Sequence, residues 1–279
     1  MAVKIVTDST SDIPQSLADE LGIASVPVYV QFDSKTYRDR EEITENEFYE
    51  KLVSFPVHPT TSQPSPQDFI DVYNKLSGEG ADGILSIHLA AKLSGTYNSA
   101  LRAKELTSAE CPVEVVDTNS VSMGLGLIVV KAARMAASGA NIKQILEKIK
   151  EMSERSHIWA VFDTLKYLAM GGRIGKGKAL LGNVLNIKPL LTLKDGEFMP
   201  ASKARSRDKA IEILYGYAEK VGKIEDISVM YSTIADEAES LAKKLEAMCG
   251  KKPIIARLGP ALGVHAGPGA LAIALIASE

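Results

Sequence analysis

Three short segments of the chain concentrate hydroxyl side chains where helices are predicted to begin. They are TDSTSD (7–12), TTSQPSP (60–66) and LSGTYNSA (93–100). Hydroxyl groups and the free N–H groups at a helix N-terminus together suit a small anion, such as a carboxylate or a phosphate. For any one segment, ordinary helix capping by Ser, Thr and Asp is the alternative interpretation.

A second candidate for chemistry is a histidine that stands among glycines. His265 lies in LGPALGVHAGPGALAIAL (258–275) and is one of only four histidines in the chain. Glycines let the backbone approach a ligand closely, and an imidazole can orient a carboxylate or move a proton. A loop histidine without any binding role is the alternative.

A third candidate is the basic, glycine-rich segment GGRIGKGKA (171–179). It matches the first part of a phosphate-binding loop, G-x-x-x-x-G-K. Such a loop requires a Ser or Thr next, where this chain has Ala179, and it requires a preceding strand, where a helical pattern stands. We therefore interpret the segment as a turn between helices. Its cations Arg173, Lys176 and Lys178 form an exposed positive loop that can dock a partner.

Other familiar sites receive little support from the sequence. The pair Gly124 and Gly126 resembles the start of a dinucleotide fingerprint, but Val129 replaces the third glycine, so tight helix packing is the better interpretation. The chain has no HExxH motif, no clustered Cys and His, and no GxSxG elbow, so we expect no metal, no cofactor and no local hydrolase triad. Asp8, Asp12 and Asp117 have side chains that can bind magnesium in principle, but helix capping is the better interpretation of all three.

Composition narrows the class of protein. The chain has 279 residues, a net charge of −3, 46% hydrophobic and 24% charged residues. The charge gives no basis for binding nucleic acid, and no apolar run is long enough to span a bilayer. The start of the chain lacks the apolar core of a signal peptide, and the two cysteines form no CxxC pair. We expect a soluble cytoplasmic protein with two reduced thiols.

The elements that position these candidates alternate regularly in the first half of the chain. Short apolar stretches at 3–8, 83–89 and 113–117 are each followed by a loop and a helical pattern. This alternation predicts a parallel sheet, whose ligands sit at the carboxyl ends of the strands. We expect the three hydroxyl-rich segments to share that edge.

The second half of the chain has a different pattern. Residues 187–204 form two apolar stretches around Lys194, Asp195 and Gly196, a hairpin signal. Alternating helices and strands follow, then a glycine loop around His265 and a final helix over 270–277. We predict an α/β protein of two domains: a three-layer α/β/α domain with a parallel sheet (1–154) and an α+β domain with a mixed sheet (155–279).

Six motifs taken together identify a resemblance. VTDSTSDIP, TSQPSP, LSGTYNSA, VVDTNSVSMGLG, GGRIGKGKALLGNVLNIKPLL and GVHAGPGALA occur in this order from residue 6 to residue 272. The chain resembles the DegV family, which includes the fatty-acid-binding carrier subunits of bacterial fatty acid kinases. The resemblance implies a long-chain fatty acid, of the palmitate, stearate or oleate type, buried between two domains. It also implies that a separate ATP-dependent kinase subunit phosphorylates the bound carboxylate.

The resemblance also implies which residues hold the carboxylate. By motif they are Thr61 and Ser62 of TSQPS, Ser94 of LSGTY, His265 of GVHAGPG and Arg205 after the hairpin. His265 would face the carboxylate, which it orients or assists during phosphorylation. In this interpretation the protein is a lipid-binding carrier and not an enzyme by itself, and its second domain contributes to the acyl-chain pocket.

Elementary energetics agree with such a site. Burying the roughly 14 methylenes of a 16-carbon acid yields on the order of 11 kcal/mol before the costs of association. ALLGNVL (179–185) and ALAIALI (270–276) are candidate linings, although plain core packing is their alternative. A buried carboxylate costs several kcal/mol unless donors replace its water, which the hydroxyls, Arg205 or a protonated His265 can do.

Two other functions stay open on the sequence alone. One is a phosphotransferase or small-molecule kinase that itself uses a nucleotide at the hydroxyl-rich segments; the other is a regulatory protein that senses lipid through the same pocket. The weak phosphate-loop match counts against the first. Intrinsic ATP turnover would separate the carrier from the enzyme, and dependence on a second protein would separate the carrier from the sensor.

Overall fold

The computed structural model describes residues 3–180 and 187–278. Its first sheet is parallel throughout, as predicted, in the strand order β2-β1-β6-β7. The strands are β1 (Val3–Asp8), β2 (Ala24–Val26), β6 (Gly83–His88) and β7 (Val113–Asp117). Every residue of β6 is buried, as expected for a strand covered on both faces.

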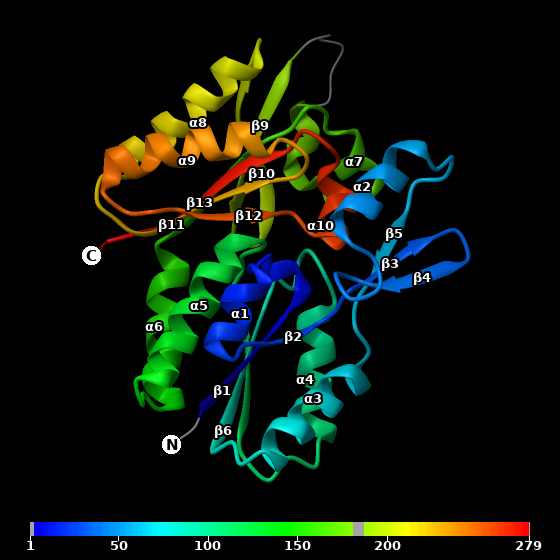
Figure 1. Ribbon diagram of the computed structural model, residues 1–279, viewed down its shortest axis with the longest axis vertical. Helices are drawn as coiled ribbons and strands as arrows, with labels where there is room; N and C mark the ends of the chain where they lie inside the picture. The colour runs from blue at the N-terminus through cyan, green and yellow to red at the C-terminus, as the bar shows by residue number, and fades with distance from the viewer. Residues whose placement is uncertain (1–2, 181–186, 279) are drawn as a thin grey trace.

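Helices cover both faces of this sheet and complete the three layers that the sequence predicts (Figure 1). On one face lie α3 (Pro66–Gly78) and α4 (Thr96–Leu106), and on the other α1 (Gln15–Leu21), α5 (Met123–Ala137) and α6 (Ile142–Glu154). Gly126 lets α5 pack closely against the turn that follows β1, because a Cβ there would lie 2.7 Å from the Ser11 carbonyl oxygen. The glycine pair at 124 and 126 thus serves helix packing.

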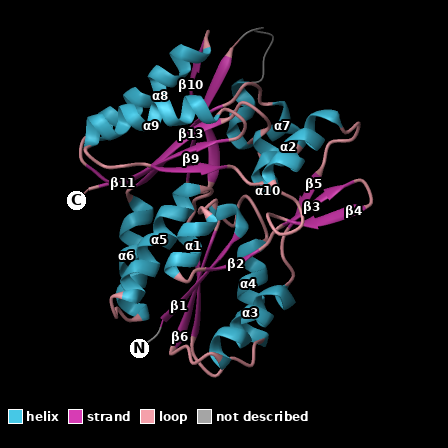
Figure 2. Cartoon of the chain, in the orientation of Figure 1, coloured by secondary structure: helices cyan, strands magenta, loops and turns pink. Residues whose placement is uncertain are grey.

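The second sheet is mixed, as predicted, in the order β10-β9-β8-β13-β11-β12. Neighbouring strands are antiparallel except for the parallel pair β11 and β12. The strands are β8 (Ser156–Val161), β9 (Lys188–Lys194), β10 (Glu197–Ala204), β11 (Ile224–Tyr231), β12 (Ile254–Arg257) and β13 (Leu271–Ala277). Helices α8 (Arg207–Val221) and α9 (Ala235–Cys249) cover one of its faces (Figure 2).

The final element corrects one sequence prediction. Residues 271–277 form a strand and not a helix, and β13 lies in the middle of the second sheet between β8 and β11. An apolar run of this length is too short to distinguish a buried strand from a buried helix by composition. The predicted glycine loop before it contains a short helix, α10 (Pro260–Ala266), with His265 in its last turn.

A third, small sheet connects the two halves of the chain. It consists of β3 (Tyr29–Phe32), β4 (Lys35–Arg38) and β5 (Thr60–Ser62) in the order β4-β3-β5. Residues 60–62 were expected as a loop on the parallel sheet, but they pair with β3 instead. The sheet, α2 (Glu45–Ser54) and α10 share one apolar cluster that contains Val30, Phe48 and Val264.

The division into domains 1–154 and 155–279 stays a prediction. The strands before residue 155 form the first and third sheets, and those from Ser156 form the second. One apolar cluster nevertheless runs through both halves, because α5 packs on β11 and β13 as well as on β1. The space between the sheets is therefore a shared core.

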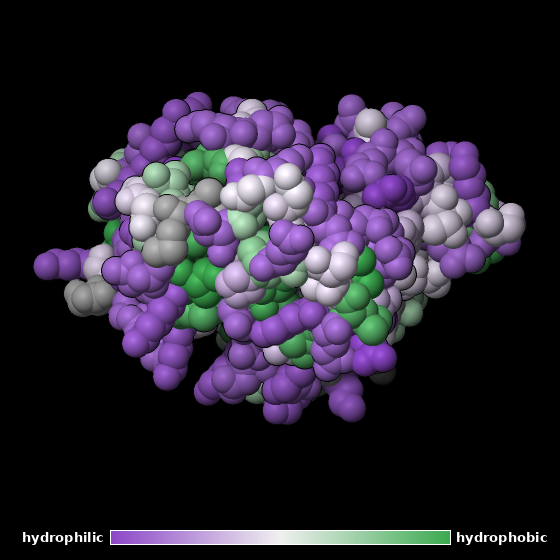
Figure 3. Space-filling view, turned by 90° about the horizontal axis from the view of Figure 1, so that it is seen from below, coloured by the Kyte–Doolittle hydropathy of each residue, from purple (hydrophilic) through white to green (hydrophobic). Residues whose placement is uncertain are grey.

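The remaining elements and the surface need only brief description. Between β8 and β9 lie α7 (Lys166–Met170) and a 3-10 helix, η2 (Gly175–Leu180). The turn expected over 171–179 thus contains the start of a 3-10 helix, and residues 181–186 lie outside the described part. Hydrophilic residues dominate the face in Figure 3, with small hydrophobic areas between them. Within 3–180 and 187–278, no helix combines the length and apolar character needed to cross a bilayer.

Candidate functional site

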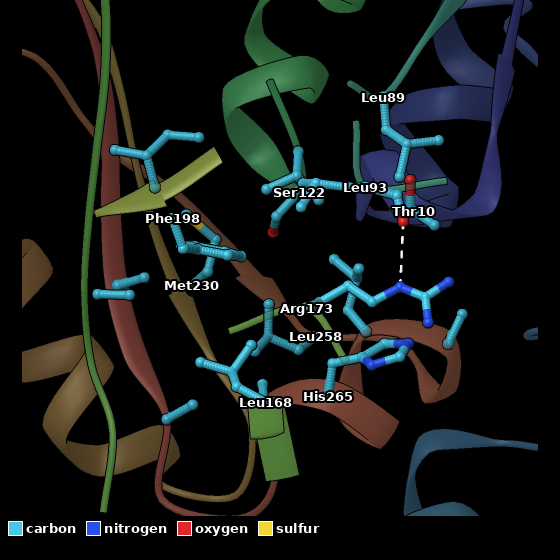
Figure 4. A pocket seen from close by; sticks show the side chains of 18 of the residues that line it. Thr10, Leu89, Leu93, Ser122, Leu168, Arg173, Phe198, Met230, Leu258 and His265 are labelled. Atoms are coloured by element: carbon cyan, nitrogen blue, oxygen red, sulfur yellow. Dashed lines mark hydrogen bonds between the residues drawn. The ribbon is translucent and has the colours of Figure 1, made fainter. Parts of the chain in front are cut away.

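A mainly apolar cavity lies between the second sheet, α10 and the loops that follow β1 and β6. The space among its lining atoms is about 860 Å³, the open solvent at its mouth included. Sites for small organic ligands typically combine apolar walls with a few polar groups, as this cavity does. Figure 4 shows the view into it, with side chains from both halves of the chain.

Small side chains leave open space on the side of the cavity that the second sheet forms. Its lining residues from the second sheet and the positions next to its strands are Ile158, Ala160, Phe162, Phe198, Met230, Ala270 and Ala272. Ala272 pairs with Ala160 on one side and with Met230 on the other, so two alanines stand side by side in the middle of one row. Large side chains there would fill the space that the alanines leave.

The polar side chains of the cavity gather elsewhere in its wall. Thr61 comes from β5, Ser94 from the loop before α4, Arg173 from the segment after α7 and His265 from α10. In Figure 4, Arg173 and His265 lie close together with Leu93 and Thr10, on the side opposite Phe198 and Met230. The cavity thus has a polar end and an apolar end.

His265 is held between Thr61 and a glycine. Its Nε2 lies 2.9 Å from Thr61 Oγ1, while its Nδ1 is buried without a hydrogen-bond partner. The imidazole lies so close to Gly171 that a Cβ on that glycine would be 2.0 Å from Nδ1. Gly171 therefore leaves the space that the imidazole occupies.

The sequence suggested a protonated His265 as one of two alternative counter-charges for the carboxylate, and burial disfavours it. Burial lowers its pKa to about 4, and the positive charge of Arg173 and the nearby His58 add to the shift. The imidazole is therefore neutral at pH 7 and cannot offset the charge of a bound anion. A carboxylate close to Nδ1 would raise the pKa again.

Arg173 supplies the positive charge at the polar end. Its Nε donates to the Leu93 carbonyl oxygen at 3.2 Å, the dashed line in Figure 4, and its Nη1 donates to the Gly171 carbonyl oxygen at 2.7 Å. These two bonds anchor the guanidinium across the gap between the segment after α7 and the loop after β6. The rest of the guanidinium is free to meet an anion.

The predicted carboxylate residues fall into two groups. Thr61, Ser94 and His265 line the same cavity, although β5 is not part of the parallel sheet. Ser62 is exposed and does not line it, since neighbouring side chains on a strand point to opposite faces. Arg205 is exposed in the loop between β10 and α8 and does not line it either.

The predicted docking residues also separate. Arg173 lines the cavity, whereas Lys176 and Lys178 are exposed. Lys176 Nζ lies 3.5 Å from a carboxylate oxygen of Glu197. The cavity-lining role of Arg173 had no signal in the sequence, because its neighbours in space, Leu93 and His265, lie about 80 and 92 positions away.

Two further hydroxyl residues line the cavity without having been singled out. Thr10, in the first hydroxyl-rich segment, donates to Asp8, which also lies 2.9 Å from His88 Nδ1. Ser122 donates to Asp12 at 2.6 Å. Both hydroxyl protons are thus committed to buried carboxylates, so these residues offer a ligand only acceptor oxygens.

A polar groove adjoins the cavity at its polar end. The groove and the cavity share four lining residues, which are Leu93, Ser94, Arg173 and Phe198. Lys92 and Glu197 line the groove but not the cavity. Lys92 Nζ donates to the Asp195 carbonyl oxygen at 2.8 Å, across the groove. A group bound between Ser94 and Arg173 is therefore close to solvent.

The three aspartates considered for magnesium have separate partners. Asp117 accepts hydrogen bonds from the Asn119 and Ala91 main-chain N–H groups, and Asp12 pairs with Arg40. The part of the chain that the structure describes contains no group of three or more His, Cys, Asp or Glu side chains suited to a metal ion.

Comparison with known proteins assigns this chain to a family. A model described as an uncharacterised protein of the DegV family matches residues 2–278. The chain belongs to the DegV family. It is 37% identical over 276 residues to a DegV domain-containing protein of Caldanaerobacter subterraneus, with 97% of each chain covered.

Solved structures agree over the full length of the DegV chain. A fatty-acid-binding DegV protein from Thermus thermophilus matches with a TM-score of 0.89 and 37% identity, covering 100% of both chains. A stearic acid-binding protein from Eubacterium ventriosum matches with a TM-score of 0.90 and 27% identity, covering 99% of this chain and 98% of the other. The mixed α/β architecture is thus the DegV fold.

The DegV cavity of this chain can hold an amphipathic molecule in one orientation. Its apolar end favours a hydrocarbon, while its polar end offers hydroxyls, a neutral imidazole and one guanidinium. These groups can bind an anion and orient it.

Proposed function

We propose that the cavity binds a long-chain fatty acid with its carboxylate at the polar end and its acyl chain along the second sheet. The observation that carries the proposal is the union of an apolar cavity with Thr61, Ser94, Arg173 and His265 at one end. The fatty-acid-binding relatives from Thermus thermophilus and Eubacterium ventriosum support it.

The polar end meets the requirement of a buried carboxylate. An ionised carboxylate needs donors and an opposite charge to replace its hydration. Ser94 Oγ, at 2.9 Å from Thr96 Oγ1, can turn its proton toward the cavity, and Arg173 supplies the charge. Thr61 and His265 share one proton between them, so one of the pair can donate to the ligand.

We further propose that the protein presents this carboxylate to a separate ATP-dependent fatty acid kinase and acts as a carrier. The polar groove beside Ser94 and Arg173 supports this role, since a phosphoryl group can reach the carboxylate from that side. Exposed Lys176 and Lys178 flank this region as docking cations. The basic segment follows α7 and not a strand, which disfavours a nucleotide site on this chain.

The first test is native mass spectrometry of the protein purified from a bacterial host, followed by lipid extraction and identification. We expect one fatty acid per chain, and the extract will give its length and saturation. Delipidated protein should take up palmitate or oleate again. A protein that arrives empty and fails to take up either acid would contradict the proposal.

The carrier role has a test of its own. The loaded protein is incubated with ATP alone and then with ATP and a purified bacterial fatty acid kinase. We expect acyl phosphate only in the second reaction. His265→Ala should lower phosphorylation more than it lowers fatty acid binding. ATP turnover by the chain alone would instead favour the phosphotransferase.

A further inference from the structure

We infer that Asp12 and Asp39 are positioning residues for the polar end of the cavity: they hold the main chain at the start of α10, and through this short helix they fix His265 beside Thr61. The inference rests on the proposed function only where it concerns lipid binding. The hydrogen bonds that support it do not depend on that function.

Asp12 joins three distant segments at the base of α10. Its Oδ1 accepts from the Gly259 N–H at 2.9 Å and from Arg40 Nη2 at 2.8 Å, while its Oδ2 accepts from Ser122 Oγ at 2.6 Å. Gly259 is the residue immediately before α10, and Ser122 lines the cavity. One carboxylate therefore ties the cavity wall to the start of the helix.

Asp39 holds the same helix two residues further along the chain. Its Oδ1 accepts from the Ala261 N–H at 3.1 Å, and the Ser9 hydroxyl also hydrogen-bonds to this carboxyl group. Its Oδ2 is buried and has no partner. Ala261 itself lines the cavity, so the carboxyl group acts directly behind the wall.

Neighbouring groups secure the chain that leads into α10. Arg40 Nη2 donates to the Arg257 carbonyl oxygen at 2.8 Å, and Tyr49 OH donates to the Leu258 carbonyl oxygen at 3.1 Å. Together with the two aspartates, these contacts hold the main chain at residues 257, 258, 259 and 261. All four side chains come from the first 49 residues of the chain.

The placement of these acids is costly, which argues for a role. Burial raises the pKa of Asp39 to about 6 and also raises the pKa of Asp12, although Arg40 lowers both. Arg40 pairs directly with Asp12 and with Glu45, and its charge also favours the ionised form of the buried Asp39. Buried acids at such positions commonly serve a site. Here they stand behind a wall of the cavity and reach none of its space.

The geometry explains how His265 depends on them. α10 has only seven residues and ends at Gly267, so its own hydrogen bonds cannot hold it in one orientation. His265 lies one turn beyond Ala261 on the cavity side, where it meets Thr61. A loosened N-terminus would let the helix tilt and admit water to the imidazole.

The test compares Asp39→Ala with Asp39→Asn. Alanine removes the acceptor for the Ala261 N–H, whereas asparagine keeps Oδ1 and places its NH₂ where Oδ2 has no partner. The readouts are the pKa of His265 from NMR titration and hydrogen exchange of the amides of 259–267. Asp71→Ala is the matched control, because Asp71 is exposed on α3 and does not line the cavity.

We expect Asp39→Ala to raise the pKa of His265 by at least about one unit toward its ordinary value. Amide exchange in 259–267 should become about 10-fold faster, and fatty acid should dissociate about 10-fold faster. Asp39→Asn should restore all three values, and Asp71→Ala should change none. A folded Asp39→Ala variant with an unchanged His265 titration and unchanged exchange would overturn the inference.

A milder variant keeps the test decisive if Asp39→Ala does not fold. Tyr49→Phe removes only the hydrogen bond to the Leu258 carbonyl oxygen and should shift the His265 titration and the exchange in the same direction by less. No shift in either would count against the inference. The titration and exchange need no lipid, so a wild-type protein that binds no fatty acid would refute the proposed function and leave this test intact.

Discussion

The two ends of the cavity are built in opposite ways. The apolar end is formed by side chains at every second position of paired strands, such as Ala272 of β13, together with Ala270 two residues before it. The polar end brings together four residues from four separate segments, and hydrogen bonds hold it. The apolar end should thus respond to volume, and the polar end to the loss of single atoms.

The strongest test of the apolar end is Ala272→Phe. The ring would occupy the space that about four methylenes need, at a cost of about 3 kcal/mol, so palmitate affinity should fall about 100-fold. Octanoate, which does not reach as far, should lose much less. Competition with a fluorescent fatty acid measures both. Ala169→Phe, an exposed position on α7, is the control, and an equal loss for both acids would break the comparison.

Arg173→Met tests the polar end. It keeps the apolar stem but removes the charge and the donor, so fatty acid affinity should fall by about 1.5–3 kcal/mol, or about 10- to 100-fold. The affinity for the fatty alcohol of the same length should change little, because it carries no charge. Lys178→Met, on an exposed side chain, provides the control. A parallel loss for acid and alcohol would mean that Arg173 acts only through packing.

The pH dependence of stability tests the burial of His265. Because its pKa is lowered from 6.5 to about 4, the unfolded chain binds more protons between these values. Stability from this residue is therefore fully present above pH 6.5 and is lost as the pH falls toward 4, by about 3 kcal/mol. His265→Gln should flatten that part of the curve in urea unfolding. A curve that keeps the wild-type slope would show an exposed imidazole.

The smallest effect is expected at Arg205. This side chain is exposed and does not line the cavity, so Arg205→Ala should change fatty acid affinity by less than about 2-fold, the usual range for a surface substitution. Isothermal titration alongside Arg173→Met makes the contrast direct. A loss at Arg205 comparable to that at Arg173 would mean that the loop after β10 moves to the ligand.

Much of the fold could be predicted because its signals are local. The capping boxes at Thr44, Ser65 and Asn141 begin their helices, and the buried β6 follows the alternation of strands and helices. The strand β13 could have been predicted as well. Small side chains at 270, 272 and 274 alternate with large ones at 271, 273 and 275, which is the two-residue period of a strand.

The candidate site was predictable in part. Thr61, Ser94 and His265 belong to segments whose composition already suggested a binding role, and they line one cavity. The choice between Arg173 and Arg205 was not predictable. Both are basic residues beside a helix, and only the packing of α7 against α10 brings Arg173 to His265.

The sequence by itself determined where helices and strands begin, which segments carry hydroxyls, and that the chain has the DegV pattern. These properties depend on residues a few positions apart, through caps, turns and hydrophobic period. Only the tertiary structure decided that β5 leaves the parallel sheet, that Arg173 supplies the charge, and that Asp12 and Asp39 hold α10 from more than 200 residues away. Such contacts depend on how whole elements pack, and no local pattern records them.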